Sequence, residues 1–406
     1  MSKITYTHLR DICNVNQGLQ ISIDKRFKEA KENRYFYITV QFLKDSYLEK
    51  YYVENPTKST ICEEDDILVV RTGNTGQIIT GIKGCFHNNF FKVNFDKNKL
   101  NSKFLYYCLT TKEKQYEMSK RAGITTIPDL NHFMFLDMQI PLQSKENQDS
   151  IVKILDSINS KIELNNRINK ELESMAKTLY DYWFVQFDFP DENGKPYKSS
   201  GGKIFYNKEL KREIPKGWEV KTLNELLINC SDSISNSNIS EKDKYTPIDY
   251  LPMKKMSFGS YLDSKEAKTS LIKYKEYDIL IGAMRVYFHR VCIAPFNGIT
   301  RTTCLVLRAK NQNHLPYLFQ LCNEDRTINI ANKLSTGSQQ PYVNWENNLE
   351  KYKVSFPNDI NLVNNYSKKI DKLIKKVILN EKENQKLSEL RDWLLPMLMN
   401  GQVRVK

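Results

Sequence analysis

The sequence has no apolar segment long enough to cross a membrane. Over 406 residues no hydrophobic run approaches the roughly 20 residues that a transmembrane helix needs. The first residues, MSKITYTHLRDIC, lack the apolar stretch found in secretory signals. We therefore expect the protein to stay in the cytoplasm.

The cysteines and histidines show none of the spacings that hold a metal ion. No CxxC pair occurs, and Cys62, Cys85 and Cys108 are too far apart in sequence for a local zinc knuckle. The histidines form no HExxH pattern; they are His8, His87, His132, His289 and His314. For the eight cysteines we expect buried free thiols in a reducing compartment, with no metal on this chain.

Motifs for methyl transfer and nucleotide binding are also missing. An adenine methyltransferase needs a glycine-rich cofactor loop and a tetrapeptide such as Asn-Pro-Pro-aromatic against the flipped base. The nearest match, Asn-Pro-Thr at 55–57, lacks the second proline and the aromatic residue. Gly76 and Gly81 have the spacing of a P-loop, but Ile82 stands where the phosphate-binding lysine belongs. The sequence disfavours both classes of enzyme.

One pattern is similar to the metal-binding PD…ExK motif of many nucleases. Pro190-Asp191 is followed by Glu209-Leu210-Lys211. Such a site needs rigid strands that fix two carboxylates on one cation. The density of Gly, Pro, Ser and Lys over residues 186–217 predicts a flexible polar connector instead. We expect no catalytic residue in this chain.

Basic residues outnumber acidic ones. The formal net charge is +13 and the pI is about 9.1. A positive excess suits a polyanionic partner, because each neutralised phosphate releases counterions. A chain that is merely rich in Lys and Asn would have a similar charge, so other observations must decide.

The most informative feature is an internal duplication. Five landmarks recur in the same order, displaced by 212 to 216 residues. They pair Leu9-Arg10-Asp11-Ile12 with Leu223-Asn224-Glu225-Leu226, Asp66–Val69 with Asp278–Ile281, Phe104-Leu105 with Tyr317-Leu318, Gly123 with Gly337, and Ile140-Pro141 with Phe356-Pro357. The chain is therefore expected to contain two copies of one domain.

Each copy has a mixed strand-and-loop region followed by a long amphipathic helix. In the first helix we assign heptad positions a to Ile151, Ile158, Asn165, Leu172 and Leu179, and positions d to Ile154, Lys161, Ile168, Met175 and Tyr182, with Leu155 and Ile162 widening the apolar stripe. In the second helix, near 362–395, the stripe comprises Tyr366, Ile370, Leu373, Val377, Leu387 and Leu394.

Two such helices in one chain are predicted to pair as an antiparallel coiled coil. About 30 residues would give about 45 Å of helix. Two unrelated core helices are the alternative, and the duplication favours pairing. Asn165 and Asn384 fall on the apolar stripes, where they either fix the register or simply face solvent.

These patterns predict an α+β chain of five parts. A first domain spans 1–145, a first helix 146–185 and a connector 186–217. A second domain spans 218–358, and a second helix with a tail spans 359–406.

Polar loops at matching places in the two copies indicate DNA recognition. Arginine is suited to guanine, side-chain amides to adenine, and glycine allows the backbone to approach a phosphate. The candidates in the first copy are Arg71, Thr72, Gly73, Asn74, Thr75, Arg121, Thr125 and Thr126. Those in the second are Arg285, Tyr287, His289, Arg290, Arg301, Thr302, Ser335, Gly337, Ser338, Gln339 and Gln340. Any one loop alone would pass for an ordinary turn.

Nearly the whole chain resembles the specificity subunits of type I restriction–modification systems. Tyr182-Trp183-Phe184-Val185 with FDFPDENGKPYKSSGGK is similar to the family's central connector. IPKGWEV at 214–220 looks like the entry to its second target-recognition domain, and LLPMLMNG at 394–401 like the end of its second conserved helix.

The resemblance implies that each domain reads one half of a bipartite double-stranded DNA site. The paired helices would set the gap and bind two methyltransferase subunits, and two motor-nuclease subunits would join for cleavage. S-adenosylmethionine, ATP and Mg²⁺ would belong to those partners. Two alternatives stay open: a coiled-coil adaptor without sequence-specific DNA binding, and an orphan subunit that serves methylation only.

Overall fold

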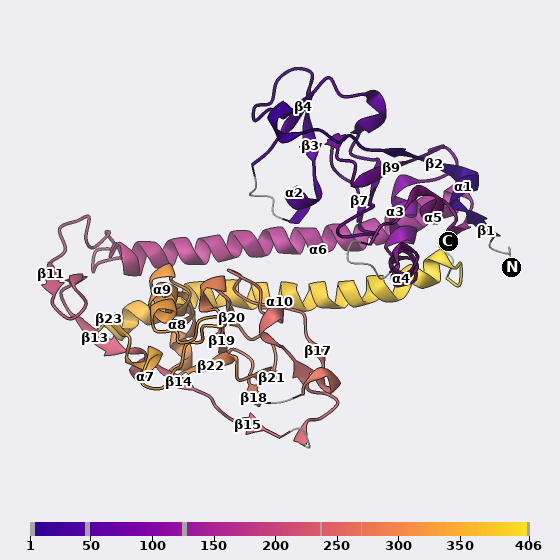
Figure 1. Ribbon diagram of the computed structural model, residues 1–406. Coiled ribbons are helices and arrows are strands. Elements are labelled where there is room, and N and C mark those ends of the chain that lie inside the picture. Colours follow the sequence, from indigo (N-terminus) through magenta and orange to yellow (C-terminus); the bar gives the residue numbers. More distant parts are fainter. Residues whose placement is uncertain (1–4, 45–48, 124–127, 236–237, 269, 404–406) are drawn as a thin grey trace. The chain divides into compact units, whose positions relative to one another are not determined.

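The computed structural model describes residues 5–44, 49–123, 128–235, 238–268 and 270–403 (Figure 1). The chain folds into two compact units. The first comprises residues 1–159 and 389–406, and the second comprises residues 160–388. Each unit therefore contains one strand-and-loop domain together with parts of both long helices.

Two long helices account for the chain's most regular structure. Helix α6 spans Lys145–Tyr180 and continues into a short π-helical turn, Asp181–Val185. Helix α10 spans Ile360–Met399. No Gly or Pro interrupts α6, and the single proline of α10, Pro396, lies in its last turns. Uninterrupted hydrogen bonding over this length is what the absence of helix breakers allows.

The first unit is built on two small sheets and one strand pair. Strand β1 (Thr5–His8) pairs antiparallel with β10 (Gln139–Leu142), and the short helix α1 (Leu9–Ile12) follows β1. One sheet has the order β2-β9-β6-β7, with bounds Cys13–Gln17, Phe90–Phe95, Ile67–Val70 and Ile78–Ile79. The other has the order β4-β3-β8-β5, with bounds Tyr52–Glu54, Arg34–Ile38, Gly84–Phe86 and Ile61–Cys62.

The second unit repeats the same plan. Strand β13 (Trp218–Thr222) pairs antiparallel with β23 (Lys353–Pro357), and α7 (Leu223–Leu226) follows β13. The sheet β14-β22-β19-β20 comprises Leu227–Asn229, Cys304–Ala309, Ile279–Gly282 and Val291–Ile293. The sheet β15-β18-β21-β16-β17 comprises Ser233–Ile234, Leu271–Tyr274, Gly298–Arg301, Lys244–Tyr245 and Leu262–Asp263.

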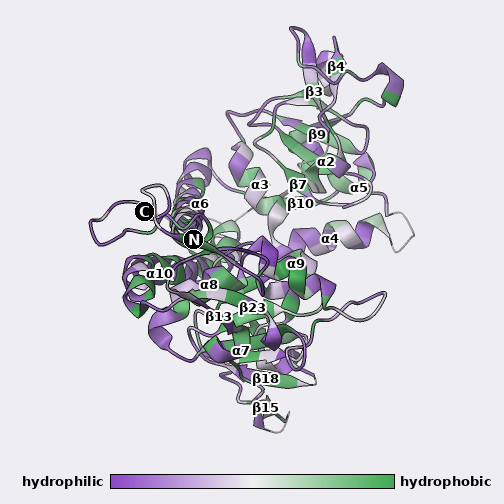
Figure 2. Ribbon diagram, turned by 90° about the vertical axis from the view of Figure 1, so that its left-hand side faces the viewer, coloured by the Kyte–Doolittle hydropathy of each residue, from purple (hydrophilic) through white to green (hydrophobic). Residues whose placement is uncertain are grey.

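Helices follow the last strand of the β2-type sheet in both units. In the first unit they are α3 (Ser102–Thr110), α4 (Lys112–Ala122) and α5 (His132–Leu136), and α2 (Val40–Lys44) precedes them. In the second they are α8 (Leu315–Cys322) and α9 (Asp325–Lys333). Some strands, among them β7 and β18, are coloured as hydrophobic in Figure 2, and most of their side chains are buried. The predicted duplication and α+β class are confirmed.

The two long helices pair antiparallel, as predicted. In the second unit Asn165 contacts Asn384, and Asn169, one turn later on α6, contacts Asn380, one turn earlier on α10. In the first unit Arg391 donates to the side-chain oxygen of Asn159 at 3.2 Å. Partner numbers thus fall on one helix as they rise on the other.

Of the five d positions assigned to α6, Ile154 and Ile168 are half-buried, but the other three are wrong. Lys161, Met175 and Tyr182 are exposed, whereas Leu155 and Ala176 are fully buried. The buried stripe instead combines the predicted a positions with the residues that follow them by four, which include 155, 162, 169 and 176. Residues three and four positions apart both lie on the same face of a helix. Because Met175 and Tyr182 are apolar, the sequence pattern favoured the spacing of three, whereas the buried residues follow the spacing of four.

The four asparagines form a buried polar layer in the helix pair. Asn165, Asn169, Asn380 and Asn384 are between 1% and 7% exposed. The Asn165 Nδ2 donates to Asn384 Oδ1 at 2.9 Å, and the Asn380 Nδ2 donates to Asn169 Oδ1 at 2.7 Å. Of the two interpretations of Asn165 and Asn384, the solvent-exposed one is therefore wrong.

The connector is ordered, and the prediction of a flexible segment is wrong. Strands β11 (Ile204–Asn207) and β12 (Arg212–Pro215) form a hairpin. Phe187 and Phe189 are buried, and the Phe189 ring stacks on Tyr197 with centroids 4.7 Å apart. The aromatic residues supply a local core that the polar composition concealed.

The nuclease-like residues of the connector are occupied in other contacts. Asp191 accepts hydrogen bonds from the backbone N–H groups of Asn193 and Lys195, and Glu209 pairs with Lys353 at 3.1 Å. Within the residues that the structure describes, no group of three or more His, Cys, Asp or Glu side chains could hold a metal ion.

Candidate nucleic-acid interface

In the first unit, the loop that follows β6 is joined to the segment before α5. The Arg71 guanidinium donates from Nε and Nη2 to the two oxygens of Asp129, at 2.6 and 2.9 Å. Thr72 forms an isolated bridge with Asp129, and the Thr75 hydroxyl donates to the Pro128 carbonyl at 2.9 Å. Two segments more than 50 residues apart thus make one surface, which we call the first loop cluster (71–77 with 128–130).

The first loop cluster borders an open pocket of about 640 Å³. Gln115 of α4 supports it by donating to the carbonyls of Gly76 and Leu109. Gly73 and Gly76 have φ angles of 98° and 85°, which residues with a side chain rarely adopt. The polar groups lining the pocket come from side-chain amides and hydroxyls, Asn74, Thr75, Gln77, Thr110, Gln115 and Ser119.

The other candidates in the first copy lie differently. Arg121 is half-buried and donates to Glu117 at 3.0 Å and to Asp137 at 3.2 Å. Both carboxylates, against the opposing effect of burial, raise the pKa of Arg121 and keep it charged. Thr125 and Thr126 lie outside the described residues. A DNA contact by any of the three stays a prediction.

In the second unit, three predicted segments converge on one surface. The Arg285 N–H donates to the Pro341 carbonyl at 2.7 Å, and its Nη2 donates to the Gln339 carbonyl at 3.2 Å. The Tyr342 hydroxyl donates to the Thr302 carbonyl at 2.9 Å. We call this surface the second loop cluster (284–290, 301–303 and 335–342). Its members Arg301, Thr302, Gly337, Ser338, Gln339 and Gln340 are exposed, and Ser335 is half-buried.

His289 and Arg290 of this cluster are held by protein carbonyls. His289 is buried, and its Nε2 lies 2.9 Å from Asn323 Oδ1 and 3.0 Å from the Asn323 carbonyl. Arg290 donates through Nη1 to the carbonyls of Ile248, Asp249 and Leu251. Their polar atoms are therefore committed to the fold, whereas Tyr287 beside them is exposed.

Sequence reasoning missed several members of both clusters. Asp129 and Gln115 hold the first cluster together but lie far along the chain from Arg71. Phe288 is exposed next to Tyr287 in the second cluster. Of these residues, only Phe288 could have been identified from the sequence, because it is an aromatic residue next to the predicted site residue Tyr287.

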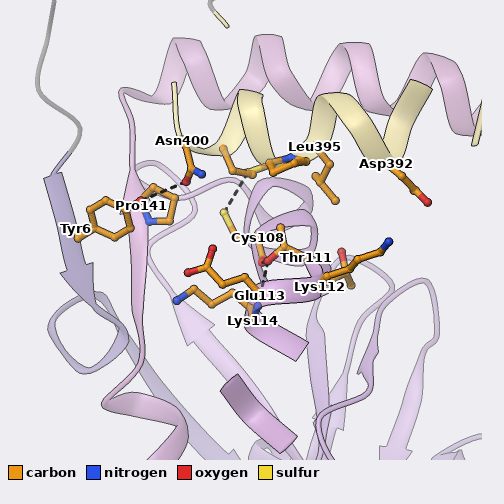
Figure 3. A pocket seen from close by; sticks show the side chains of 13 residues that line it. Tyr6, Cys108, Thr111, Lys112, Glu113, Lys114, Pro141, Asp392, Leu395 and Asn400 are labelled. Carbon is orange, nitrogen blue, oxygen red and sulfur yellow. Dashed lines mark hydrogen bonds between the residues drawn. The ribbon is translucent and has the colours of Figure 1, made fainter. Parts of the chain in front are cut away.

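One further pocket, of about 420 Å³, lies in the first unit between α10 and the α3–α4 turn (Figure 3). Its apolar lining includes Leu395, Pro141 and Met399, with charged groups such as Lys112 at the edge. The Cys108 thiol contacts the Met399 sulfur at 3.3 Å, and burial raises its pKa. A thiol that stays protonated is a poor nucleophile, so Cys108 is not suited to nucleophilic chemistry in this pocket.

Apolar side chains remain exposed on the long helices of both units. In the second unit Met175 is 58% exposed, beside an open groove of about 520 Å³ that Leu179 and Leu373 also line. In the first unit Trp393 is 56% exposed, and Leu390 lies one turn away. Met175 and Leu390 are 215 residues apart in sequence, and Thr178 and Trp393 have the same separation.

No helix in the described part of the chain is both long and apolar enough to span a membrane. All eight cysteines are free and buried.

A duplicated domain that presents two different polar loop surfaces, joined to a paired-helix element, is typical of a protein with two recognition surfaces. The chain belongs to the type I restriction–modification DNA specificity domain family, whose model matches residues 1–174 and 215–389. Members of this family recognise DNA sequence within restriction–modification systems and are not catalytic.

Known proteins of similar sequence and fold agree with this assignment. The MjaIX specificity subunit of Methanocaldococcus jannaschii is 27% identical over 79% of this chain and 73% of its own length. The MjaVIII specificity subunit of the same organism is 26% identical over 93% and 88%. The crystal structure of a type I S subunit from M. genitalium has a TM-score of 0.56 at 18% identity, covering 98% of this chain and 97% of that one.

Proposed function

We propose that this chain reads a bipartite double-stranded DNA site and directs adenine methylation and cleavage by partner subunits. The first loop cluster reads one half-site and the second loop cluster reads the other. The observation that carries this proposal is the equivalence of the two clusters: each lies beyond the same strand of the repeated sheet, β6 or β19, and in each an isolated bridge joins that loop to a later segment, Thr72 to Asp129 and Met284 to Tyr342. The second cluster adds the 301–303 segment.

The two clusters differ in residue type, as two different half-sites require. The first loop cluster presents glycines, hydroxyl groups and the side-chain amides of Asn74 and Gln77 near β6. The second offers the rings of Tyr287 and Phe288 with the amides of Gln339 and Gln340. Side-chain amides and apolar groups are both direct readers of base edges in the major groove. Two copies of one fold that carry different loop residues support a target whose two half-sites differ in sequence.

The helix pair is proposed to fix the gap between the half-sites. Helix α6 has 36 residues, which corresponds to about 54 Å of helix at 1.5 Å per residue. One turn of DNA is about 35 Å long. The buried asparagine layer supports a single register, because any slip would leave these amides opposite apolar side chains.

The exposed apolar side chains on the helices are proposed to bind two methyltransferase subunits. The patch around Met175 and the patch around Trp393 occupy equivalent places in the two repeats. Large apolar groups left exposed on a helix are typical of a surface that a partner covers. Two equivalent patches support two copies of one partner. Two motor-nuclease subunits would complete the complex that cleaves DNA.

The cofactors are proposed to belong to the partners. S-adenosylmethionine would be held by the methyltransferase subunits, and ATP with Mg²⁺ by the motor-nuclease subunits. We place the complex in the cytoplasm, since eight free buried thiols are typical of proteins kept in a reducing compartment.

The test of the bipartite reading is a map of methylated adenines across the genome, with this gene present and then deleted. We expect deletion to remove one motif made of two short half-sites around a fixed gap. An unchanged map, with the partner methyltransferase expressed, would contradict the proposal and would favour the adaptor alternative.

The docking proposal is tested by Met175→Ser and Trp393→Ser, with the methyltransferase subunits counted by native mass spectrometry. Each variant should lose one copy, and the double variant both. Ile23→Ser is the matched control, because Ile23 is also an exposed apolar side chain but belongs to the short 3-10 turn Ile23–Lys25 and not to either long helix. Two bound copies in the double variant would refute these patches as docking sites.

A further inference from the structure

We propose that Tyr287 and Phe288 read a thymine of the second half-site by apolar contact with its 5-methyl group. This inference rests on the proposed function of the second loop cluster and specifies its chemistry. The two side chains, which we call the aromatic tip, are 49% and 39% exposed. A single exposed apolar side chain is common on protein surfaces and needs no explanation. Two large ones side by side on a polar, basic surface suggest a binding function.

The backbone under the aromatic tip is strained on both sides. The tip lies on a single 3-10 turn, Val286–Phe288. The residues that flank it, Arg285 and His289, both have left-handed conformations, with φ of 51° and 54°. A residue with a side chain is rarely stable in this conformation and persists there only where the surrounding structure enforces it. Strain of this kind commonly marks a binding site.

The surrounding structure does enforce it, from three directions. Arg285 is bonded to the backbone of Gln339 and Pro341, His289 to Asn323, and Arg290 to the carbonyls of the 248–251 segment. The polar side chains of this turn are therefore its supports. What the turn presents to solvent are two preorganised aromatic rings, which lose little entropy on binding.

The geometry of the rings favours contact by an edge rather than stacking. The Tyr287 and Phe288 centroids are 4.9 Å apart with the ring planes inclined at 54°. The two tilted rings therefore form no shared flat surface, and stacking on either ring would require a base to leave the duplex, which the reading of a double-stranded half-site does not need. Within a duplex, the apolar group that a base edge offers in the major groove is the thymine methyl.

The neighbouring side chains fit the other base of the same pair. Gln339 and Gln340 are exposed in the same cluster, and Arg285 contacts the Gln339 carbonyl. A glutamine amide can bond to the N6 and N7 atoms of adenine in the major groove. Amide and aromatic groups together suit an A·T pair. In the first cluster the corresponding loop carries Thr75, whose hydroxyl is already bonded to Pro128.

The test uses this chain assembled with its methyltransferase subunits and duplexes carrying the mapped target. Each thymine of both half-sites is replaced in turn by deoxyuridine, which removes only the 5-methyl group. We expect one position in the second half-site to lower the methylation rate about fourfold, the value of one buried methyl group. Phe288→Ala or Tyr287→Ala should lower the rate on thymine DNA similarly but add no further loss at that deoxyuridine.

Two more variants separate methyl contact from other roles. Phe288→Leu should keep the sensitivity to deoxyuridine, because leucine still offers an apolar group. Tyr287→Phe should behave like the wild type, since the proposal uses the ring and not the hydroxyl. Discrimination at the first half-site should be unchanged in every variant, which also shows that the variants are folded.

The proposal is overturned if the second half-site contains no thymine, or if no deoxyuridine position affects the rate. It is also overturned if the losses from the alanine variant and from deoxyuridine multiply, because the tip would then act elsewhere, for example as a wedge between base steps. A wild-type complex that methylates no bipartite motif would instead be a failure of the proposed function itself.

Discussion

The asparagine layer of the helix pair makes a quantitative prediction about a buried hydrogen bond. Asn165 Nδ2 donates to Asn384 Oδ1 at 2.9 Å and to Glu383 Oε2 at 2.7 Å. Asn165→Leu removes the donor and leaves the Asn384 oxygen buried without it. We expect the free energy of unfolding to fall by about 1–3 kcal/mol, the cost of an unsatisfied buried polar group.

The reciprocal change should be milder. In Asn384→Leu, the Asn165 amide keeps its bond to Glu383, so the loss should be about 0.5–1.5 kcal/mol. Asn384 also donates to Asn166, which is exposed and can bond to water instead. The double variant replaces both amides with apolar groups of similar size and should be close to the wild type in stability.

Urea unfolding of the four proteins measures these differences as a double-mutant cycle. The Asn165→Leu midpoint should fall by about 0.3–1 M with an unchanged slope. Asn365→Leu, on an exposed position of α10, controls for the change in helix propensity. Additive single effects would refute the reasoning. In the assembled complex, a quadruple variant in which Asn169 and Asn380 are also replaced by leucine should methylate sites with more than one gap, because no amide of the layer then specifies the register.

Three further predictions follow from the helices and the loop clusters. Removing one heptad from α6 and the facing heptad from α10 should change the gap of the methylated motif and leave both half-sites unchanged; an altered half-site with the old gap would contradict the role of the helices. Arg71→Lys keeps the charge but loses the two-pronged bond to Asp129, so methylation assays should show a several-fold loss of discrimination at the first half-site only, with Arg34→Lys as the control. Burial raises the pKa of Glu173, so its carboxylate weakens folding as the pH rises through the ordinary glutamate range; Glu173→Gln should therefore unfold at higher temperature than the wild type at neutral pH, with no difference below about pH 4, and a constant difference at all pH values would contradict this.

The duplication, the two long helices and the polar loops at matching places in the two copies were accessible from the sequence. Repeated landmarks such as Asp66–Val69 and Asp278–Ile281 do correspond to equivalent strands, β6 and β19. These features are accessible because hydrophobic periodicity and repeat order are local properties of the chain. The heptad register could not be read from the sequence, because Met175 and Tyr182 are apolar but face outward.

Features that depend on tertiary contact escaped prediction. The ion pair of Arg71 with Asp129 joins residues far apart in sequence, and nothing in the sequence around either residue indicates its partner. The order of the connector depends on Phe189 stacking on Tyr197 within a polar segment. The support given by His289 and Arg290 to the aromatic tip is also tertiary, so the sequence could identify that loop without separating its readers from its supports.

The asparagine layer also has the internal symmetry of the two repeats. Asn165 and Asn380 stand at equivalent places in the two repeats, as do Asn169 and Asn384, each pair being 215 residues apart. The hydrogen bonds join non-equivalent positions of the two copies. Asn165 bonds to Asn384, and its equivalent Asn380 bonds to Asn169. Had the copies been separate polypeptides, the same bonds would have closed a symmetric dimer. Because one chain carries both copies, each half can change its loops independently, whereas the shared helix interface constrains both copies together.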